Sequence, residues 1–265
     1  MVRCSAVVFV LSCFASVALA QAPASTARPS TITPALNTVA ATVAPPPEAN
    51  RRCLGVIAAA DRFMVKKIGL TVFSSETAVA PIEGWGLDDL IVARVHVAAG
   101  AGVTVLRLAY PKNVFEPFYD PPSKPFQTPR SQLTAIVRRI AGSTRCKRYV
   151  VITAFPGAYS RTNQTLSGVG VYQTSLFKKA YLFAYPLVTV FDGENFAIRK
   201  NPYATIQSRL TEAFLVPRKD FDREIDSTLF PLSAVEAVNS TALRNGARAV
   251  LAESLDDMLP AFLRE

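Results

Sequence analysis

The sequence predicts a single α/β domain with a mixed β-sheet, packed by two crossover helices and a long C-terminal helix. Three observations lead to this fold class. Short apolar runs typical of strands alternate with segments whose apolar residues recur at helical spacing. Asp192-Gly193 separates two later strand patterns, as in a hairpin, and the segment from Ser233 onward repeats apolar residues every three or four positions. With 265 residues, half of them hydrophobic, the chain can bury a sizeable core.

The first twenty residues, MVRCSAVVFVLSCFASVALA, have the features of a secretory signal peptide. They begin with one arginine, continue with a short apolar region and end in an A-x-A sequence, which predicts cleavage after Ala20. The alternative is lipid attachment at Cys13, because Val-Leu-Ser-Cys loosely resembles a lipobox, although that cut leaves a very short apolar region. We therefore expect a periplasmic or secreted protein without a transmembrane segment in the mature chain.

Residues 21–50 are rich in Ala, Thr and Pro, contain no aromatic residue and carry two charged residues, Arg28 and Glu48. Such a segment cannot bury enough apolar surface to offset its ordering entropy, so it is expected to be a disordered tether. The α/β domain is then expected over residues 51–265.

The first part of this domain is expected to alternate strands and helices. Apolar runs predict strands at 53–60 and 63–73, around a turn at Asp61 and Arg62, and again at 103–110 and 148–155. Helical spacing predicts helices at 86–100, with Asp88 and Asp89 in the first turn, and at 131–142.

The second part is expected to be an antiparallel meander that a long helix follows. The strands of the meander are predicted at 167–173, 180–191 and 195–200. The helix from Ser233 to the end of the chain is expected to be amphipathic, with a weak point at Gly246 and a kink at Pro260.

Two cysteines remain after signal cleavage, Cys53 and Cys146, and each stands directly before a predicted strand. In a β-helix-β crossover the linked strands are parallel, so their starts lie at the same edge of the sheet. If the two strands are neighbours, the thiols come within bridging distance, and an oxidising compartment favours a disulfide. The alternative is a pair of free, buried thiols.

A bridge between the cysteines would gather their basic neighbours, Arg51, Arg52, Arg145, Lys147 and Arg148, into one patch. Removing Arg3 with the signal leaves 28 Lys and Arg against 20 Asp and Glu, a formal charge of +8. Such a patch could hold an anionic envelope polymer, or it could be a solvated rim. No basic helix or basic-aromatic motif points to nucleic acid.

The segment 110–130 joins a predicted strand to a predicted helix and is rich in proline and aromatic residues. Long loops inside compact domains are often functional, so Phe115, Phe118, Tyr119 and Phe126 are candidates for contact with a partner protein. The alternative is that these side chains fasten the loop to the core. The same two readings apply to Tyr181, Phe183 and Tyr185, which share one strand face beside Pro186.

No catalytic residue, metal site or cofactor is predicted. The chain has one histidine, His96, and no G-x-S-x-G sequence, and the acidic run 219–226 has Ile225 where a calcium loop needs glycine. The G-x-G of SGVGVYQ lacks the third glycine of a dinucleotide site. Gly168 and Gly170 are expected instead to make room for neighbouring side chains.

Four stretches, KKIGLTVF, GLDDLIVARV, VTVLRL and SGVGVYQ before the Asp-Gly hairpin, follow one another in an order that resembles small α/β domains of Gram-negative envelope proteins. These are the amino-terminal domain of the Tol-system propeller protein and the curli-secretion lipoprotein. The resemblance covers most of residues 53–200 and is one of pattern. It implies binding and assembly roles and no active site.

The sequence therefore predicts an exported, non-enzymatic binding or envelope-assembly module, in an oligomeric state that it does not define. One alternative is an enzyme acting on an envelope polymer, with carboxylates such as Asp88 and Asp89 as acid-base groups. Another is a structural subunit that self-associates through the aromatic strand face.

Overall fold

The structure is a computed structural model that describes residues 53–69, 74–120, 128–154, 156–159, 164–201 and 221–264, with the backbone alone for 156–159. The chain divides into two units, Met1–Ala44 and Pro45–Glu265, and all the described residues belong to the second. The predicted signal peptide (1–20) and tether (21–50) lie outside the described residues.

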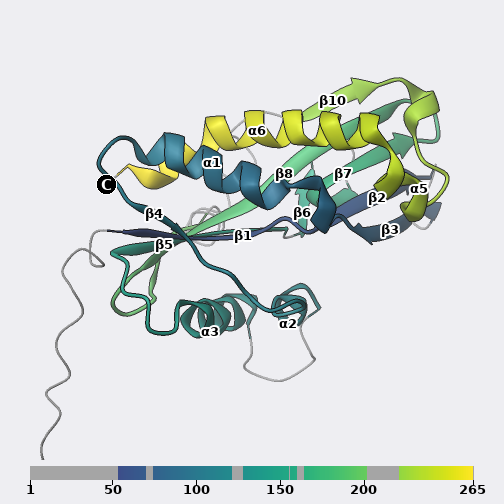
Figure 1. Cartoon of the computed structure of the whole chain (residues 1–265). Helices are drawn as coiled ribbons and strands as arrows, with labels where there is room; N and C mark the ends of the chain where they lie inside the picture. The colour runs from purple at the N-terminus through teal and green to yellow at the C-terminus, as the bar shows by residue number, and fades with distance from the viewer. Residues whose placement is uncertain are drawn as a thin grey trace, which may run out of the picture. The chain divides into compact units, whose positions relative to one another are not determined.

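A mixed sheet forms the centre of this unit, which confirms the predicted fold class (Figure 1). Its hydrogen-bonded path runs through β3 (Glu76–Pro81), β2 (Arg62–Ile68), β7 (Gln164–Thr174), β8 (Ala180–Asp192), β5 (Arg148–Ala154), β1 (Leu54–Ala59) and β4 (Val105–Arg107). Off this path, β6 (Pro156–Tyr159) pairs with β7, and β9 (Ile198–Lys200) and β10 (Asp222–Ile225) pair with β8.

The long strand β8 joins two halves of the sheet. Residues 180–185 pair antiparallel with β7, and residues 186–192 pair antiparallel with β5. Pro186 falls where β8 passes from one partner to the other, between the residues that pair with β10 and those that pair with β9. Proline has no backbone N–H to donate to a neighbouring strand. At the point where β8 changes partners, this missing donor interrupts the pairing least.

The half beyond β5 is parallel: β1 lies between β5 and β4 and pairs in parallel with both. All six residues of β1 are buried, as expected for a strand covered on both faces. Helices connect these strands. Helix α1 (Leu87–Ala99) precedes β4, and α2 (Glu116–Tyr119) and α3 (Pro129–Ala141) come between β4 and β5.

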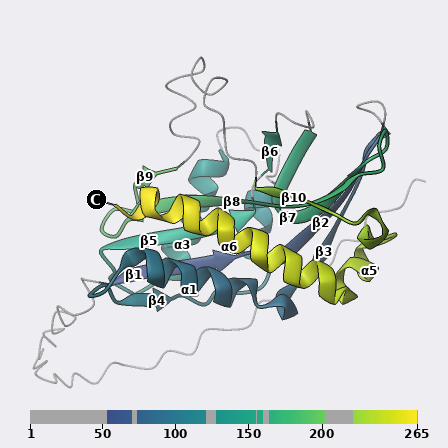
Figure 2. The ribbon, with the colours of Figure 1, turned by 90° about the horizontal axis from the view of Figure 1, so that it is seen from above.

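Helices cover both faces of the sheet. Figure 1 shows α1 and α6 (Thr241–Leu263) on one face and α2 and α3 on the other. Figure 2 shows α1 and α6 side by side, in agreement with their mutual contacts. Beneath them lies a core that includes Ile91, Val95 and Leu251, whereas Leu133 and Val137 of α3 belong to a second core. None of the described helices is both long and apolar enough to cross a membrane.

Local sequence explains where α3 and α6 start. The side chain of Thr128 accepts from the backbone N–H of Ser131, whose hydroxyl accepts in return from the N–H of Thr128, so that a capping box starts α3. Ser240 likewise caps α6 by accepting from the N–H of Leu243 at 3.3 Å. Each cap satisfies backbone donors that have no partner within the helix.

Several features differ from the sequence-based expectation, which contained no β6, no β10 and, within the 110–130 loop, no α2. Strand β3 was not predicted, because it lies at the edge of the sheet and buries only Ala80 among its six residues. The expected helix from Ser233 is divided into α5 (Ala234–Asn239) and α6, with the break at Ser240 rather than Gly246. Arg62, which was expected in the turn after the first strand, is the first residue of β2. Strand β1 pairs with β4 and β5, and β2 pairs with β3 and β7.

Candidate functional site

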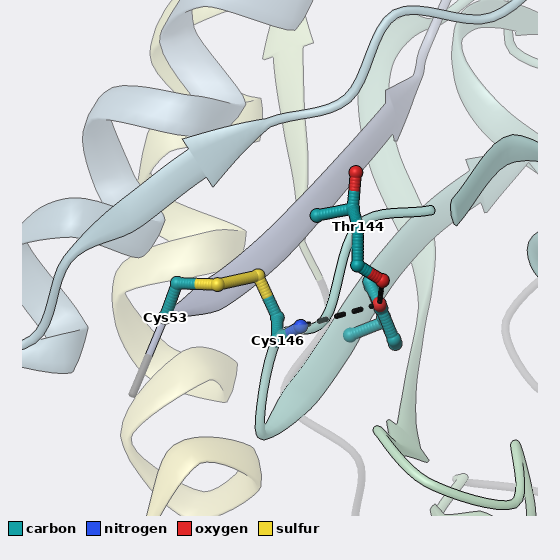
Figure 3. The surroundings of a disulfide bond; sticks show 4 residues. Cys53, Thr144 and Cys146 are labelled. Carbon is teal, nitrogen blue, oxygen red and sulfur yellow. Dashed lines mark hydrogen bonds between the residues drawn. A yellow bond between two sulfur atoms is a disulfide. The ribbon is translucent and has the colours of Figure 1, made fainter. Parts of the chain in front are cut away.

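The predicted disulfide is present: the sulfur atoms of Cys53 and Cys146 are bonded, with their Cα atoms 4.6 Å apart. The reason is the expected one, because β1 and β5 are parallel neighbours in which Leu54 pairs with Arg148. Figure 3 shows the bridge at the start of both strands. The N–H of Cys146 donates to the hydroxyl of Tyr149 at 3.3 Å, and that hydroxyl donates to the carbonyl of Thr144 at 2.5 Å.

Of the basic residues that flank the cysteines, Arg145 and Lys147 are exposed and Arg148 is half-buried. Arg51 and Arg52 lie outside the described residues. Lys147 and Arg148 line a pocket of about 230 Å³ together with residues from β8, β9 and the end of α6. We call it the basic pocket; its described lining residues are Lys147, Arg148, Val190, Arg199, Lys200, Phe262 and Arg264.

The end of α6 positions several of these cations. Arg148 donates to the carbonyl of Leu263 at 3.1 Å, and Lys200 donates to the carbonyl of Ala261 at 3.2 Å and to that of Arg264. The last carbonyls of a helix have no partner within it and carry partial negative charge, which favours cations at this end. Part of the positive charge therefore stabilises the C-terminal end of α6. The same hydrogen bonds hold the basic side chains around the pocket.

Asp192 is the carboxylate that orders the β9 side of the basic pocket. It pairs with Arg199, whose Nε lies 2.8 Å from its Oδ2, and accepts from the backbone N–H of Glu194 at 2.9 Å and of Asn195 at 3.2 Å. The hydrogen bond from Arg199, followed by these backbone bonds, holds the pKa of Asp192 below its usual value.

Gly193 places the β8–β9 hairpin against the segment that carries Cys146. Its N–H donates to the carbonyl of Lys147 at 2.9 Å. A Cβ atom at this position would lie 1.9 Å from the carbonyl oxygen of Cys146, so no other residue fits without displacing the backbone. The Asp192-Gly193 sequence thus forms the predicted hairpin and also brings β9 to the disulfide.

The aromatic residues that the structure describes in segment 110–130 pack against the core. Phe115 is 4% exposed and Phe118 is 2% exposed, and both belong to the core under α3. Tyr119 is half-buried, with its hydroxyl 3.4 Å from the carbonyl of Ala59 and the Arg62 guanidinium 4.6 Å from its ring centre. Phe126 lies outside the described residues. For Phe115 and Phe118 the structure gives the packing role that the sequence left open as the alternative to partner contact.

The aromatic face of β8 is internal at its centre, Phe183, and half-buried at Tyr181 and Tyr185. Phe183 is fully buried and stacks with Tyr185 at 5.6 Å, while Tyr181 stacks with Tyr172 of β7 at 5.0 Å. Gly170 accounts for this packing, because a Cβ atom there would lie 2.5 Å from the ring of Phe183. Gly168 similarly lies against Ala154, so both glycines make room for neighbouring side chains, as predicted.

A second hollow lies at the carboxyl ends of β1 and β4. Sequence reasoning did not locate it, although Asp88, one of the two candidate acid-base carboxylates, lines it; the other, Asp89, is exposed and pairs with Arg107. We call this hollow the acidic cleft. It has a volume of about 390 Å³, and among its lining residues are Asp61, Glu83, Asp88, Arg107, Tyr110 and Lys112. In open α/β sheets ligands commonly bind outside the carboxyl ends of parallel strands. One sequence signal was available: Asp61 comes directly after a run of buried strand residues.

Asp88 ties the start of α1 to the parallel strands. Its Oδ1 accepts from the N–H of Ala60 at 3.2 Å. Its Oδ2 lies 3.5 Å from the hydroxyl of Tyr110 and 3.8 Å from the guanidinium of Arg107. Burial raises the pKa of Asp88; the hydrogen bond from the N–H of Ala60 and the charge of Arg107 lower it, while Asp61 and Asp89 raise it further.

Asp61 is less well satisfied. Its Oδ1 is buried and has no hydrogen-bond partner among the described residues. Burial raises the pKa of Asp61; nearby Arg62 and a hydrogen bond from its own backbone N–H lower it, while Glu83 and Glu116 raise it further. Chemically, such a carboxyl group could donate or accept a proton, or hold a cationic group.

No protein-family model, no curated protein and no solved structure matches the chain. The candidate sites therefore depend on the geometry of this chain alone.

Proposed function

We propose that the protein is an exported, non-enzymatic binding module of the bacterial cell envelope and that its contact surface is the basic pocket. The single observation that carries this proposal is the convergence of basic side chains from β5, β9 and the end of α6 on one hollow. Five of the seven described lining residues are basic and none is acidic. Such a surface favours anionic partners, which the polymers and lipids of an envelope provide.

Export is supported by two independent features. The first twenty residues have the pattern of a signal peptide. The Cys53–Cys146 disulfide suits an oxidising compartment, because cytosolic thiols are usually kept reduced. The resemblance to envelope domains, which implies binding and assembly roles, supports the same function.

Cosedimentation with isolated Gram-negative envelope fractions tests this function. The test variant is Lys147→Glu/Arg264→Glu, which reverses two charges in the pocket and leaves Arg148 and Lys200 to hold the end of α6. The control variant, Arg130→Glu/Lys178→Glu, makes the same charge change at two exposed residues, one in the first turn of α3 and one in the β7–β8 turn.

Wild type and the control variant should sediment with the envelopes, and the test variant should stay in the supernatant. Equal sedimentation of all three proteins would exclude the pocket as the contact surface. If none of the proteins sediments, the binding function itself is wrong.

A second candidate function, catalysis at the acidic cleft on an envelope polymer, is favoured by Asp61. A buried carboxyl oxygen without a hydrogen-bond partner destabilises a fold, and clusters of groups with shifted pKa values are typical of active sites. A carboxyl group with a raised pKa can act as a general acid, and two carboxyl groups suffice for glycosidic chemistry.

Turnover of envelope glycans, followed by mass spectrometry of released fragments, tests the second candidate. If the cleft is an active site, Asp61→Asn should abolish the release while Asp120→Asn, a change at an exposed carboxylate after α2, should not. Absence of any release by wild type, or equal release by Asp61→Asn, would exclude catalysis by Asp61.

A further inference from the structure

We propose that the basic pocket recognises a phosphate ester, that is, a phosphate group attached to a short carbon framework. This inference rests on the proposed function, because it names the chemical group through which the pocket would contact its partner.

The first step is charge. Among the described residues, three arginines and two lysines line the basic pocket, and a neighbouring carboxylate, Asp192, is bonded to one of them, Arg199. The pocket therefore has an excess of several positive charges. A carboxylate neutralises only one, whereas a phosphate monoester has close to two negative charges at neutral pH and three strongly accepting oxygens.

The second step is pre-organisation. Lys200 is held by the carbonyls of Ala261 and Arg264, and the Nε of Arg264 donates to the carbonyl of Pro260 at 3.0 Å. An ammonium group has three N–H donors and a guanidinium has five, so these bonds do not use the full capacity of Lys200 and Arg264. Fixed guanidinium groups match phosphate oxygens well, because their planar donors can bond two oxygens at once.

The third step is size and polarity. A volume of about 230 Å³ lies below the range of about 300–1,000 Å³ that is typical of whole-ligand pockets. The pocket can thus take one anionic group and a few carbons of a larger molecule. Val190 and the half-buried Phe262 provide an apolar wall among the cations, which suits the carbon side of an ester better than a free inorganic ion.

The test is titration of the full mature protein with glycerol 3-phosphate and with acetate, followed by NMR shifts of its backbone amides. Glycerol 3-phosphate should shift signals at Lys147, Arg199 and Arg264. Its affinity should fall at least about tenfold in Lys147→Glu/Arg264→Glu and stay unchanged in the Arg130→Glu/Lys178→Glu control, since charge-assisted bonds are lost only in the former. Lys147→Arg should keep the affinity, which separates lost charge from lost folding.

Acetate should bind at least about tenfold more weakly than glycerol 3-phosphate. Equal affinity for both anions would overturn the proposal, as would undiminished affinity in the double variant or no binding of glycerol 3-phosphate to wild type. Because this assay contains no envelope, phosphate recognition and envelope binding can fail separately.

Vesicles of phosphatidic acid, whose headgroup is a phosphate monoester, and of phosphatidylcholine distinguish two sources of the phosphate ester. If the protein binds the former and glycerol 3-phosphate displaces it, the pocket takes a lipid headgroup. If it binds soluble glycerol 3-phosphate but neither kind of vesicle, the pocket takes a phosphate ester that is not part of a membrane. Both results support recognition of the phosphate ester.

Discussion

Asp61 stands at the end of a buried strand, with one carboxylate oxygen enclosed and without a hydrogen-bond partner among the described residues. Burial raises its pKa above 3.8, so the folded protein holds this proton more tightly than the unfolded chain does. As the pH rises from below about 4, the unfolded chain ionises first, and the folded state loses relative stability until its own pKa has been passed.

The variant Asp61→Asn should therefore unfold at a higher temperature than wild type at about pH 7, because the amide carries no charge to desolvate. The gain should shrink as the pH falls toward about 3, where Asp61 is protonated in both states. Thermal unfolding across this pH range measures the effect. Asp120→Asn, at an exposed position, should show no comparable gain; a loss of stability in Asp61→Asn at neutral pH would contradict the argument.

Gly170 allows a test of packing in β7, between β2 and β8. A Cβ atom there would lie 2.3 Å from the carbonyl oxygen of Met64 and 2.5 Å from the ring of Phe183. Gly170→Ala should lower the free energy of unfolding by about 1–3 kcal/mol or more, as overpacked cores do. Gly84→Ala is the control, because nothing lies within 4 Å of its Cβ position. Denaturant unfolding in which both variants match wild type would refute the close approach.

At the scale of elements, the disulfide joins the starts of two strands that are already parallel neighbours. Its two cysteines are 93 residues apart, and a closed loop of this length stabilises a protein by about 3–5 kcal/mol in the chain-entropy model. The variant Cys53→Ser/Cys146→Ser should lose stability of this order while keeping the fold, because the β1–β5 ladder is retained.

Denaturant unfolding with and without reductant measures this contribution. Reductant should lower the midpoint of wild type to that of the double serine variant and should leave the variant unchanged. A wild-type midpoint that does not respond to reductant under unfolding conditions would show that the two strands alone supply the stability.

The elements that sequence predicted well are those with strong periodicity or strong turn signals. Helix α3 has four apolar residues on one face, β5 is a nearly continuous apolar run, and Asp192-Gly193 forms the expected hairpin. Strand β3 escaped because an edge strand with one buried residue has no alternation to detect. The break between α5 and α6 at Ser240 depends on a local N-cap. The apolar spacing continues across it, so the pattern predicted one helix.

The candidate sites were harder to predict, because each collects residues from distant parts of the chain. Lys147 and Arg148 could be placed near the cysteines from strand position alone. Their neighbours Arg199 and Lys200 are placed there by the β8–β9 hairpin, and Arg264 by the end of α6. No local sequence pattern marks these three residues. The burial of Phe115 likewise depends on how segment 110–120 packs against α3. The aromatic content of the loop alone could not predict this packing.

At the scale of the whole folded unit, the two hollows lie at opposite ends of the parallel strands. The basic pocket lies at the start of β5, and the acidic cleft lies at the end of β1. Six paired residues separate these ends, which corresponds to about 20 Å. The separation means that a charge reversal at one hollow leaves the geometry of the other intact, so the two candidate functions can be tested in one protein by independent variants.

At the scale of the whole chain, one mass measurement tests both the proposed export and the disulfide. We expect the protein, purified from a Gram-negative host without reductant, to begin at Gln21 and to be two hydrogen masses lighter than the sum of its residues. The physical reason lies in the proposed export: cleavage after Ala20 would deliver Cys53 and Cys146 to a compartment that oxidises them. A lipid-modified chain beginning at Cys13 would instead place the protein on a membrane, where a basic pocket would meet phosphate headgroups directly. An uncleaved chain with all four of its thiols free would contradict export and with it the proposed envelope function.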